Sequence, residues 1–333
     1  MNSDLDISSL KCWIVGEGLA GTENQCIGVA ESLGVKPVIK RIELREPWKS
    51  FSPALGFEQW WGFKPMMYPP WPDLVIAAGR KAVAPARFIR KAARAYEGND
   101  CFTVFLQDPK CKTNDFDMVC APKHDELDGA NVLTTVASPN RISEALLKAA
   151  KAEFSYLGTP PAPRIAVLIG GNSKSHQITK ALCEKMASDL KALDGSLMVT
   201  TSRRTPEALR AYITKQLSAP DNHIWDGSGD NPYMGYLAHA DVIIVTSDSA
   251  SMLSDACSTG KPVYRYDLDG GSEKFARLYR NLEAYGALKP FPSEIKQGKL
   301  EVWAYEPLND AAKIANAIST ALKKRNNKKV KTS

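Results

Sequence analysis

The residues best suited to chemistry lie close together between positions 246 and 255. A helix start is capped by a single serine or aspartate, yet this stretch carries five hydroxyl and two carboxyl side chains just before and within an expected helix. The surplus favours contact with a polyhydroxylated or phosphorylated ligand. Asp255, one turn into that helix, is placed to accept hydrogen bonds from ribose hydroxyls. The predicted ligand-binding residues here are Ser247, Asp248, Ser249, Ser251, Met252 and Asp255.

Two further loops carry groups that bind anions. Gly170 and Gly171 stand between an apolar run and a helical pattern, which predicts backbone N–H groups open to an anion at a helix start. A tandem arginine pair near position 203 suits bidentate contact with a phosphate. The alternatives are a structural glycine turn and arginines that contact only solvent. The predicted residues in these two loops are Gly170, Gly171, Asn172, Ser173, Lys174, Ser202, Arg203 and Arg204.

Alternating strands and helices must position these loops. Short apolar runs alternate with helical patterns along both halves of the chain, which is typical of parallel sheets with helical crossovers. The predicted strands are 12–15, 74–78, 102–106, 118–120, 165–169, 197–201, 242–245 and 263–266. In such sheets ligands bind outside the carboxyl ends of the strands. We therefore expect the loops after positions 169, 201, 225 and 245 to converge on one crevice.

The same alternation predicts two domains. A proline-rich segment, 158–163, cannot continue the helix before it, and the strand-helix pattern restarts after it. The fold class is therefore α/β, with two Rossmann-like doubly wound domains in tandem and a cleft between them. The predicted parts are an N-terminal acceptor or partner domain (1–158), a C-terminal nucleotide-sugar-binding domain (164–305), a helix packing back toward the N-terminal domain (306–325) and a basic tail (326–333).

Charge and composition exclude several classes of protein. The 333 residues include 43 Lys and Arg against 37 Asp and Glu, and six of the basic residues lie between positions 323 and 331. Without that end the balance is even, so we expect no nucleic-acid partner. No apolar run is long enough to span a membrane, the first ten residues predict no signal peptide, and seven scattered cysteines predict reduced thiols and no metal site. We expect a cytoplasmic protein.

An irregular aromatic segment, 48–71, stands apart from this pattern. It contains four of the seven tryptophans, and basic residues flank it. Such a segment suits a membrane surface, a lipid-linked acceptor or a protein partner. The alternative is that it packs into the core of its own domain. The residues predicted to make this contact are Trp48, Trp60, Trp61 and Trp71.

The stretch from Ala240 to Pro262 resembles the donor-site helix of glycosyltransferase-B enzymes, including those that make the peptidoglycan lipid intermediate. In those enzymes a glutamate on this helix holds the nucleotide ribose, and Asp255 falls at its place with one methylene less. Motifs at 18–25, 107–109, 121–125, 201–206 and 231–233 resemble the plant elongated-mitochondria fission factor family and its bacterial relatives. This second resemblance covers nearly the whole chain, and it adds Asn231 and Tyr233 to the expected donor site.

The resemblances imply roles for the first domain as well. A glycosyltransferase of this kind holds its acceptor and a general base there, in a loop predicted here to consist of Gly18, Gly21, Thr22, Asn24 and Gln25. The similar enzymes place a histidine in that loop, where this chain has Thr22 and Glu23. Glu23 is one candidate base, and His124 oriented by Asp125 is the other. Each of these groups is also suited to a plain capping or surface role.

The prediction for function is a metal-independent, cofactor-free glycosyltransferase. It would use a nucleotide-diphosphate sugar and act on an envelope or lipid-linked acceptor, as a peripheral protein at the inner membrane face. One alternative is a UDP-sugar epimerase, because some bacterial relatives are labelled as sugar-nucleotide epimerases. The other is a non-catalytic adaptor with a protein partner, because the plant branch recruits a dynamin-related protein to mitochondria.

Overall fold

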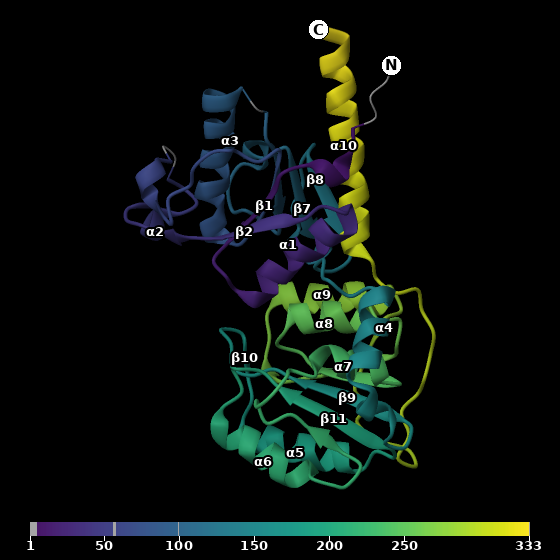
Figure 1. The fold of residues 1–333 in the computed structure, drawn as a ribbon. Coiled ribbons are helices and arrows are strands. Elements are labelled where there is room, and N and C mark those ends of the chain that lie inside the picture. Colours follow the sequence, from purple (N-terminus) through teal and green to yellow (C-terminus); the bar gives the residue numbers. More distant parts are fainter. Residues whose placement is uncertain (1–4, 56–57, 99, 333) are drawn as a thin grey trace. The chain divides into compact units, whose positions relative to one another are not determined.

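The computed structural model describes residues 5–55, 58–98 and 100–332, and for residues 329–332 the backbone alone. The chain forms two compact units. Unit 1 comprises Met1–Arg141 and Asn309–Ser333, and unit 2 comprises Ile142–Leu308. Both units are open, doubly wound parallel sheets, as the alternating pattern predicted (Figure 1). Each unit is described by itself below.

The central sheet of unit 1 has six parallel strands in the order β2-β1-β5-β6-β7-β8. Its middle strands are buried on both faces and almost wholly apolar, as parallel strands covered by helices must be. The strands are β1 (Cys12–Gly16), β2 (Pro37–Arg41), β5 (Leu74–Ala78), β6 (Phe102–Leu106), β7 (Met118–Pro122) and β8 (Val132–Thr135), with β3 (Glu43–Leu44) and β4 (Phe63–Lys64) forming a separate antiparallel pair.

Helices cover both faces of this sheet (Figure 1). They are α1 (Ala20–Leu33), the short α2 (Trp48–Phe51), α3 (Val83–Glu97) and α10 (Asp310–Thr332). Because side chains alternate along β1, Trp13 and Val15 pack with α3, and Cys12 and Ile14 pack with α1 and α10. The last helix of the chain therefore completes the core that the first strand begins.

Unit 2 repeats the arrangement with the strand order β12-β11-β9-β13-β14-β16, again all parallel. The predicted strands at 165–169, 197–201, 242–245 and 263–266 are confirmed to within one residue at each end. The strands are β9 (Arg164–Ile169), β11 (Ser196–Thr201), β12 (His223–Ile224), β13 (Val242–Thr246), β14 (Val263–Tyr266) and β16 (Leu288–Pro290), and a separate antiparallel pair joins β10 (His176–Gln177) to β15 (Asp269–Gly270).

The helices of unit 2 also divide between the two faces of its sheet (Figure 1). They are α4 (Glu144–Glu153), α5 (Lys180–Lys191), α6 (Glu207–Leu217), α7 (Tyr233–His239), α8 (Ala250–Cys257) and α9 (Glu273–Ala284). Cys183 and Met186 of α5 and Ile213 of α6 pack on Ile165, Val167 and Ile169 of β9. The helices α4, α7, α8 and α9 lie on the other side.

The units divide at Arg141–Ile142, earlier in the chain than the proline-rich segment at 158–163. The reason is α4, which packs in unit 2: His239 Nε2 on α7 lies 3.1 Å from the Lys151 carbonyl, and Gly235 leaves space for Phe154. The C-terminal helix also differs from its expected bounds of 306–325. It runs through Asp310–Thr332, so most of the expected tail at 326–333 is helical and only residue 333 lies outside the described residues.

Candidate functional site

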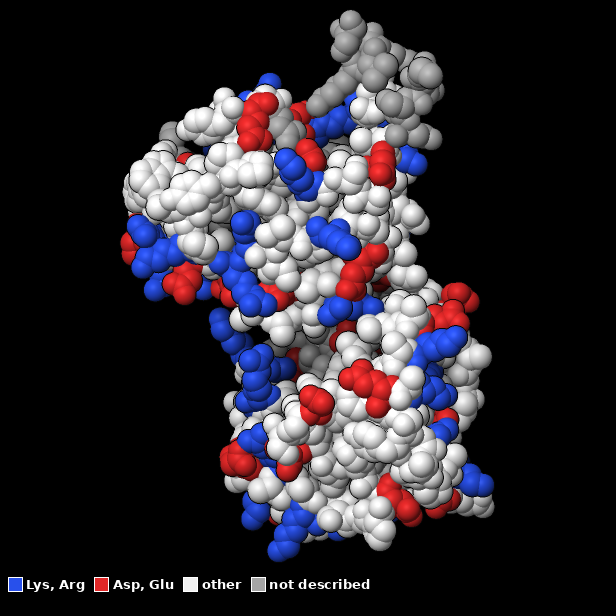
Figure 2. Space-filling model, viewed as in Figure 1, with Lys and Arg blue, Asp and Glu red and all other residues white. Residues whose placement is uncertain are grey.

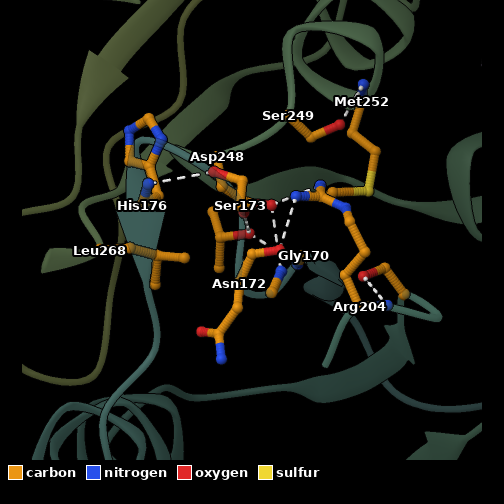
Figure 3. A network of polar contacts seen from close by, with 12 residues as sticks. Gly170, Asn172, Ser173, His176, Arg204, Asp248, Ser249, Met252 and Leu268 are labelled. Carbon is orange, nitrogen blue, oxygen red and sulfur yellow. Dashed lines mark hydrogen bonds and ion pairs between the residues drawn. The ribbon is translucent and has the colours of Figure 1, made fainter. Parts of the chain in front are cut away.

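The strand order of unit 2 marks one place for a ligand. From β9 the chain crosses to β11 on one side, and β13 lies on the other, so the sheet has its topological switch point between β9 and β13. Ligands in open parallel sheets bind at this point, outside the carboxyl ends of the strands. The loops that follow β9, β11 and β13 carry most of the residues predicted to bind a ligand, and hydrogen bonds join these three loops (Figure 3).

Asp248 connects the three loops. Its side chain is fully buried, and its Oδ2 accepts hydrogen bonds from the Gly171 amide at 3.0 Å and from Nη2 of Arg204 at 2.6 Å. Its Oδ1 accepts from the Thr246 hydroxyl at 2.7 Å. With both carboxylate oxygens engaged by protein groups, Asp248 organises the site rather than presenting a free carboxylate to a ligand.

The prediction of open amides at Gly170 and Gly171 was wrong. The Gly170 N–H donates to Thr246 Oγ1 at 2.7 Å, and the Gly171 N–H donates to Asp248. No helix starts there either, because the β10 strand intervenes and α5 begins only at Lys180. The two glycines serve close packing: a Cβ at Gly170 would lie 2.0 Å from Asp248 Oδ1, and one at Gly171 would lie 2.3 Å from the Arg204 carbonyl carbon.

The helix start that can face an anion at this edge is that of α8. Ser249 caps it by accepting the Met252 amide at 3.3 Å (Figure 3). Within the described part of the chain, the amides of Ala250 and Ser251 have no acceptor, so they and the helix dipole are available to a negative group. Ser251 and Met252 are partly exposed on this first turn.

Three cations lie on the loops around the Asp248 cluster. Arg204 is braced, with Nη2 on Asp248 and Nη1 3.3 Å from the Asn172 carbonyl. Lys174 and Arg203 are exposed, and neither has an ion-pair partner among the residues that the structure describes. Figure 2 shows basic side chains gathered at the edge of unit 2 where Figure 1 labels β10. Lys174 and Arg203 are therefore the cations that are free to contact a phosphate.

Asp255 and Tyr233 form a pair at the same edge. The Tyr233 hydroxyl donates to Asp255 Oδ2 at 2.9 Å, from α7 to α8. Burial raises the pKa of Asp255 to about 7, and the tyrosine hydrogen bond partly opposes that rise. Burial, together with the charge of Asp255, raises the pKa of Tyr233 well above its usual value. One carboxylate oxygen of Asp255 thus has a fixed donor, and its proton occupancy changes near neutral pH.

The other predicted residues of this site hold the loops in place. Asn231 accepts the Tyr233 amide at 3.0 Å, and Ser202 accepts the Arg204 amide at 3.1 Å. Ser173 Oγ accepts the His176 amide at 3.0 Å, and Asn172 Oδ1 accepts the Ile178 amide at 2.9 Å. Ser247 is buried and accepts the Leu268 amide at 2.9 Å. These side chains shape the loops.

Sequence reasoning missed a second layer of support. Tyr279 on α9 donates to the Ser247 carbonyl at 2.7 Å, and its hydroxyl lies 3.1 Å from His176 Nε2. Thr205 donates to the Gly170 carbonyl. Burial lowers the pKa of His176, which keeps its imidazole neutral. The sequence offered little to identify Tyr279, because it is far along the chain from the residues it supports and has the pattern of an ordinary helix residue.

In unit 1, the predicted base Glu23 is held in an ion pair. Arg41 donates to both of its oxygens, at 2.8 and 2.7 Å, and these hydrogen bonds lower its pKa. The other carboxylate near this loop, that of Glu17, is also paired, with its Oε2 2.8 Å from Lys81 Nζ. A carboxylate with a lowered pKa is a poor proton acceptor at neutral pH.

His124 and Asp125 lie in a short 3-10 turn, Lys123–Asp125, after β7. His124 Nε2 and Asp125 Oδ1 are 3.9 Å apart, longer than a hydrogen bond. Two strands separate β7 from β1, so this turn lies about 14 Å along the sheet from the loop after β1. The structure therefore does not bring Glu23 and His124 into one cluster.

The predicted acceptor loop is mostly the start of α1. Gly18 precedes the helix with a φ of 75°, which favours glycine. Thr22 donates to the Leu19 carbonyl at 3.0 Å, and Gln25 is buried and accepts from Gln107 Nε2 at 2.9 Å. Gly21 and Asn24 are exposed on the first turns.

The aromatic segment is divided between core and surface. Trp48 and Trp71 are each 3% exposed and belong to the core of unit 1, so their prediction as a contact surface was wrong. Trp60 and Trp61 are 57% and 42% exposed. Trp61 packs edge-on against Trp48 with ring centroids 4.7 Å apart, which anchors the exposed aromatics to the core.

No cluster of three or more His, Cys, Asp or Glu side chains suited to a metal ion occurs in residues 5–55, 58–98 and 100–328. Across the described helices, none combines the length and apolar character needed to cross a bilayer.

Known proteins resemble this chain in sequence and in fold. The family described as Mitochondrial fission ELM1 matches residues 20–322. The mitochondrial fission protein ELM1 of Arabidopsis thaliana is 34% identical over 284 residues, covering 75% of this chain and 64% of the relative. An uncharacterized protein of Rickettsia prowazekii is 29% identical over 292 residues, covering 76% of this chain and 80% of the relative.

Among solved structures, the UDP-GlcNAc 2-epimerase of Methanocaldococcus jannaschii matches with a TM-score of 0.51 at 11% identity, covering 93% of this chain and 99% of that chain. MurG of Acinetobacter baumannii matches with a TM-score of 0.47 at 13% identity, covering 94% and 90%. At such identities the likeness concerns the fold alone, which is of the glycosyltransferase-B kind.

Proposed function

The chain belongs to the mitochondrial fission ELM1 family, and from that premise we propose that unit 2 binds a nucleotide-diphosphate sugar for glycosyl transfer. The observation that supports this most is the N-terminus of α8, whose first amides have no acceptor in the described part of the chain. It follows β13 at the switch point of the sheet, where the neighbouring loops carry the exposed cations Lys174 and Arg203. Its free amides and its dipole favour a diphosphate.

The diphosphate and the ribose of the ligand each have suitable groups in unit 2. The diphosphate would contact the α8 amides with Lys174 and Arg203, while Arg204 is held in place by Asp248. The ribose hydroxyls would contact Asp255, whose second oxygen is fixed by Tyr233. These charges would stabilise the departing nucleotide diphosphate without a metal ion or a cofactor. Of the two bases predicted in unit 1, Glu23 is held in its ion pair with Arg41, so His124 stays the candidate.

The acceptor would be envelope- or lipid-linked, with the protein peripheral on a membrane. The exposed Trp60 and Trp61, together with the exposed Lys49 and Lys64 of the same segment, support that choice. The same aromatic residues favour the second candidate, a non-catalytic adaptor, since the Arabidopsis relative is named a mitochondrial fission protein. Epimerisation of a UDP-sugar would use the same nucleotide site, but it would need no acceptor and would require acid/base groups around the reacting carbon of the sugar.

Nucleotide binding is the first prediction to test. We expect UDP, GDP or ADP, or one of their sugar conjugates, to stabilise the full chain by about 2.7 kcal/mol at a hundredfold excess over Kd. Lys174→Ala combined with Arg203→Ala should abolish that shift without lowering the stability of the free protein. Thermal unfolding and calorimetry measure both quantities.

Lys215→Ala is the matched control, because Lys215 is exposed on α6 of the same unit. It should leave the ligand shift unchanged. A well-folded protein that responds to none of these nucleotides would overturn the transferase proposal and favour the adaptor. If a nucleotide binds, incubation with its sugar conjugate separates transfer from epimerisation by the product formed.

A further inference from the structure

Unit 2 contains a cavity of about 450 Å³ that shares no lining residue with the proposed nucleotide site. It lies between the end of α4 with the 3-10 turn η6 (Ser155–Gly158) and the edge strand β12 with the loop after it. The residues that decide its chemistry are Glu153, Tyr156, His223, Trp225, Asp226 and Asp230.

Aromatic rings form part of the wall. The Tyr156 ring packs against His223 with centroids 5.3 Å apart. Trp225 is fixed by its indole N–H, which donates to the Ser228 carbonyl at 2.7 Å. His223 Nδ1 lies 2.6 Å from the Tyr236 hydroxyl, and burial lowers the pKa of His223, so this ring is neutral at pH 7. The aromatic part of the wall thus carries no positive charge.

All the charge on the lining is negative. Glu153, Asp226 and Asp230 contribute carboxylates, and no Lys or Arg is among the lining residues. Hydrogen bonds from Ser228 lower the pKa of Asp226, which keeps it ionised. Burial, and then the charge of Asp230, raises the pKa of Tyr156, so Asp230 acts on the phenol.

The two arginines that lie near this wall, Arg164 beside Gly158 and Arg210 beside Gly227, are held by other carboxylates. Arg164 is paired with Asp241, and Arg210 is paired with Glu207. A cavity with aromatic walls and a carboxylate rim attracts a cation through both the ring faces and the opposite charges. We propose that this cavity binds a primary alkylammonium group, carried either by a free polyamine or by a lysine side chain of a protein partner.

Titration calorimetry of the full chain at low salt tests this proposal with cadaverine as the probe and pentanediol as its uncharged match. We expect cadaverine to bind and pentanediol not to bind. The double variant Glu153→Gln, Asp230→Asn should weaken cadaverine binding about tenfold. The control Glu294→Gln, Asp221→Asn makes the same charge change at exposed sites of unit 2 and should leave Kd unchanged.

Three outcomes would each overturn the proposal. They are equal affinity of the two double variants for cadaverine, equal affinity of the wild type for cadaverine and pentanediol, and no binding of cadaverine at all. A short lysine-containing peptide separates the two sources of the ammonium group. Tighter binding of the peptide than of cadaverine supports a protein partner, and tighter binding of cadaverine supports a free polyamine. Nucleotide binding should be the same in both double variants, so this test is independent of the proposed transferase function.

Discussion

Asp248 shows how one buried carboxylate can organise a site without contacting the ligand. It joins the loops after β9, β11 and β13 through the Gly171 amide, the Thr246 hydroxyl and Arg204. The sequence identified Asp248 as a site residue from its position before α8. It could not show that the carboxylate points inward, because that depends on partners 44 and 77 residues away.

Replacing this carboxylate should therefore cost stability. Asp248→Ala leaves the Gly171 amide and the Thr246 hydroxyl buried without their acceptor, at about 1 to 3 kcal/mol for each group. We expect the free energy of unfolding of unit 2 to fall by about 2 to 5 kcal/mol in urea titration. Asp221→Ala, at an exposed position, should change it by less than about 0.5 kcal/mol. A stable Asp248→Ala variant would contradict this role.

Asp255 should make stability depend on pH. Its folded-state pKa of about 7 lies above the unfolded value of about 3.9, so the folded protein binds the extra proton between these limits. The contribution of Asp255 to the free energy of unfolding should therefore be largest below about pH 4. It should decrease as the pH rises to about 7. Asp255→Asn should flatten this dependence in urea titrations at several pH values.

Tyr233→Phe provides the complementary variant for Asp255. It removes the hydrogen bond that lowers the pKa of Asp255, so the fall in stability should extend to higher pH. A pH dependence that is the same in the wild type, Asp255→Asn and Tyr233→Phe would show that Asp255 does not titrate in this range.

At the scale of elements, hydrophobic patterning predicted the parallel strands well, because both faces of each central strand are buried and the signal is a continuous apolar run. The helix expected right after the loop 170–175 begins later, at Lys180. Residues 176–177 pair with 269–270 as β10 and β15, a contact across more than 90 residues that no local pattern reveals. Trp48 and Trp60 likewise look alike in sequence, yet Trp48 is in the core of unit 1 and Trp60 is on its surface.

The helix α10 should stabilise unit 1 specifically. Ile318 is fully buried against the sheet, and its truncation to alanine should cost about 2 to 5 kcal/mol. We expect Ile318→Ala to shift the unfolding of unit 1 in urea and to leave that of unit 2 unchanged. Asn316→Ala, on the exposed side of the same helix, is the control. Equal effects of the two variants would contradict the packing of α10.

At the scale of the whole molecule, tandem α/β domains followed from the repeated pattern, and the structure divides the chain accordingly. The exact boundary could not be predicted from the sequence, because the pattern of α4 is equally compatible with the last helix of the first domain and the first helix of the second. Its packing against α7 decides the matter, through contacts such as that of Phe154 with Gly235. The expected cleft between the domains stays a prediction.

The split composition of unit 1 has a consequence for biosynthesis. Ile314, Ile318 and Leu322 belong to the core formed with Cys12 and Ile14, and Asp310 accepts the amides of Val136 and Ala137. A ribosome adds about 5 to 20 residues per second, so it makes all of unit 2 before it supplies these side chains. The first unit to be translated is thus the last to be completed. At that rate, the apolar sheet face that α10 covers stays exposed for roughly ten seconds or more during synthesis. A chaperone could bind this exposed face during that time.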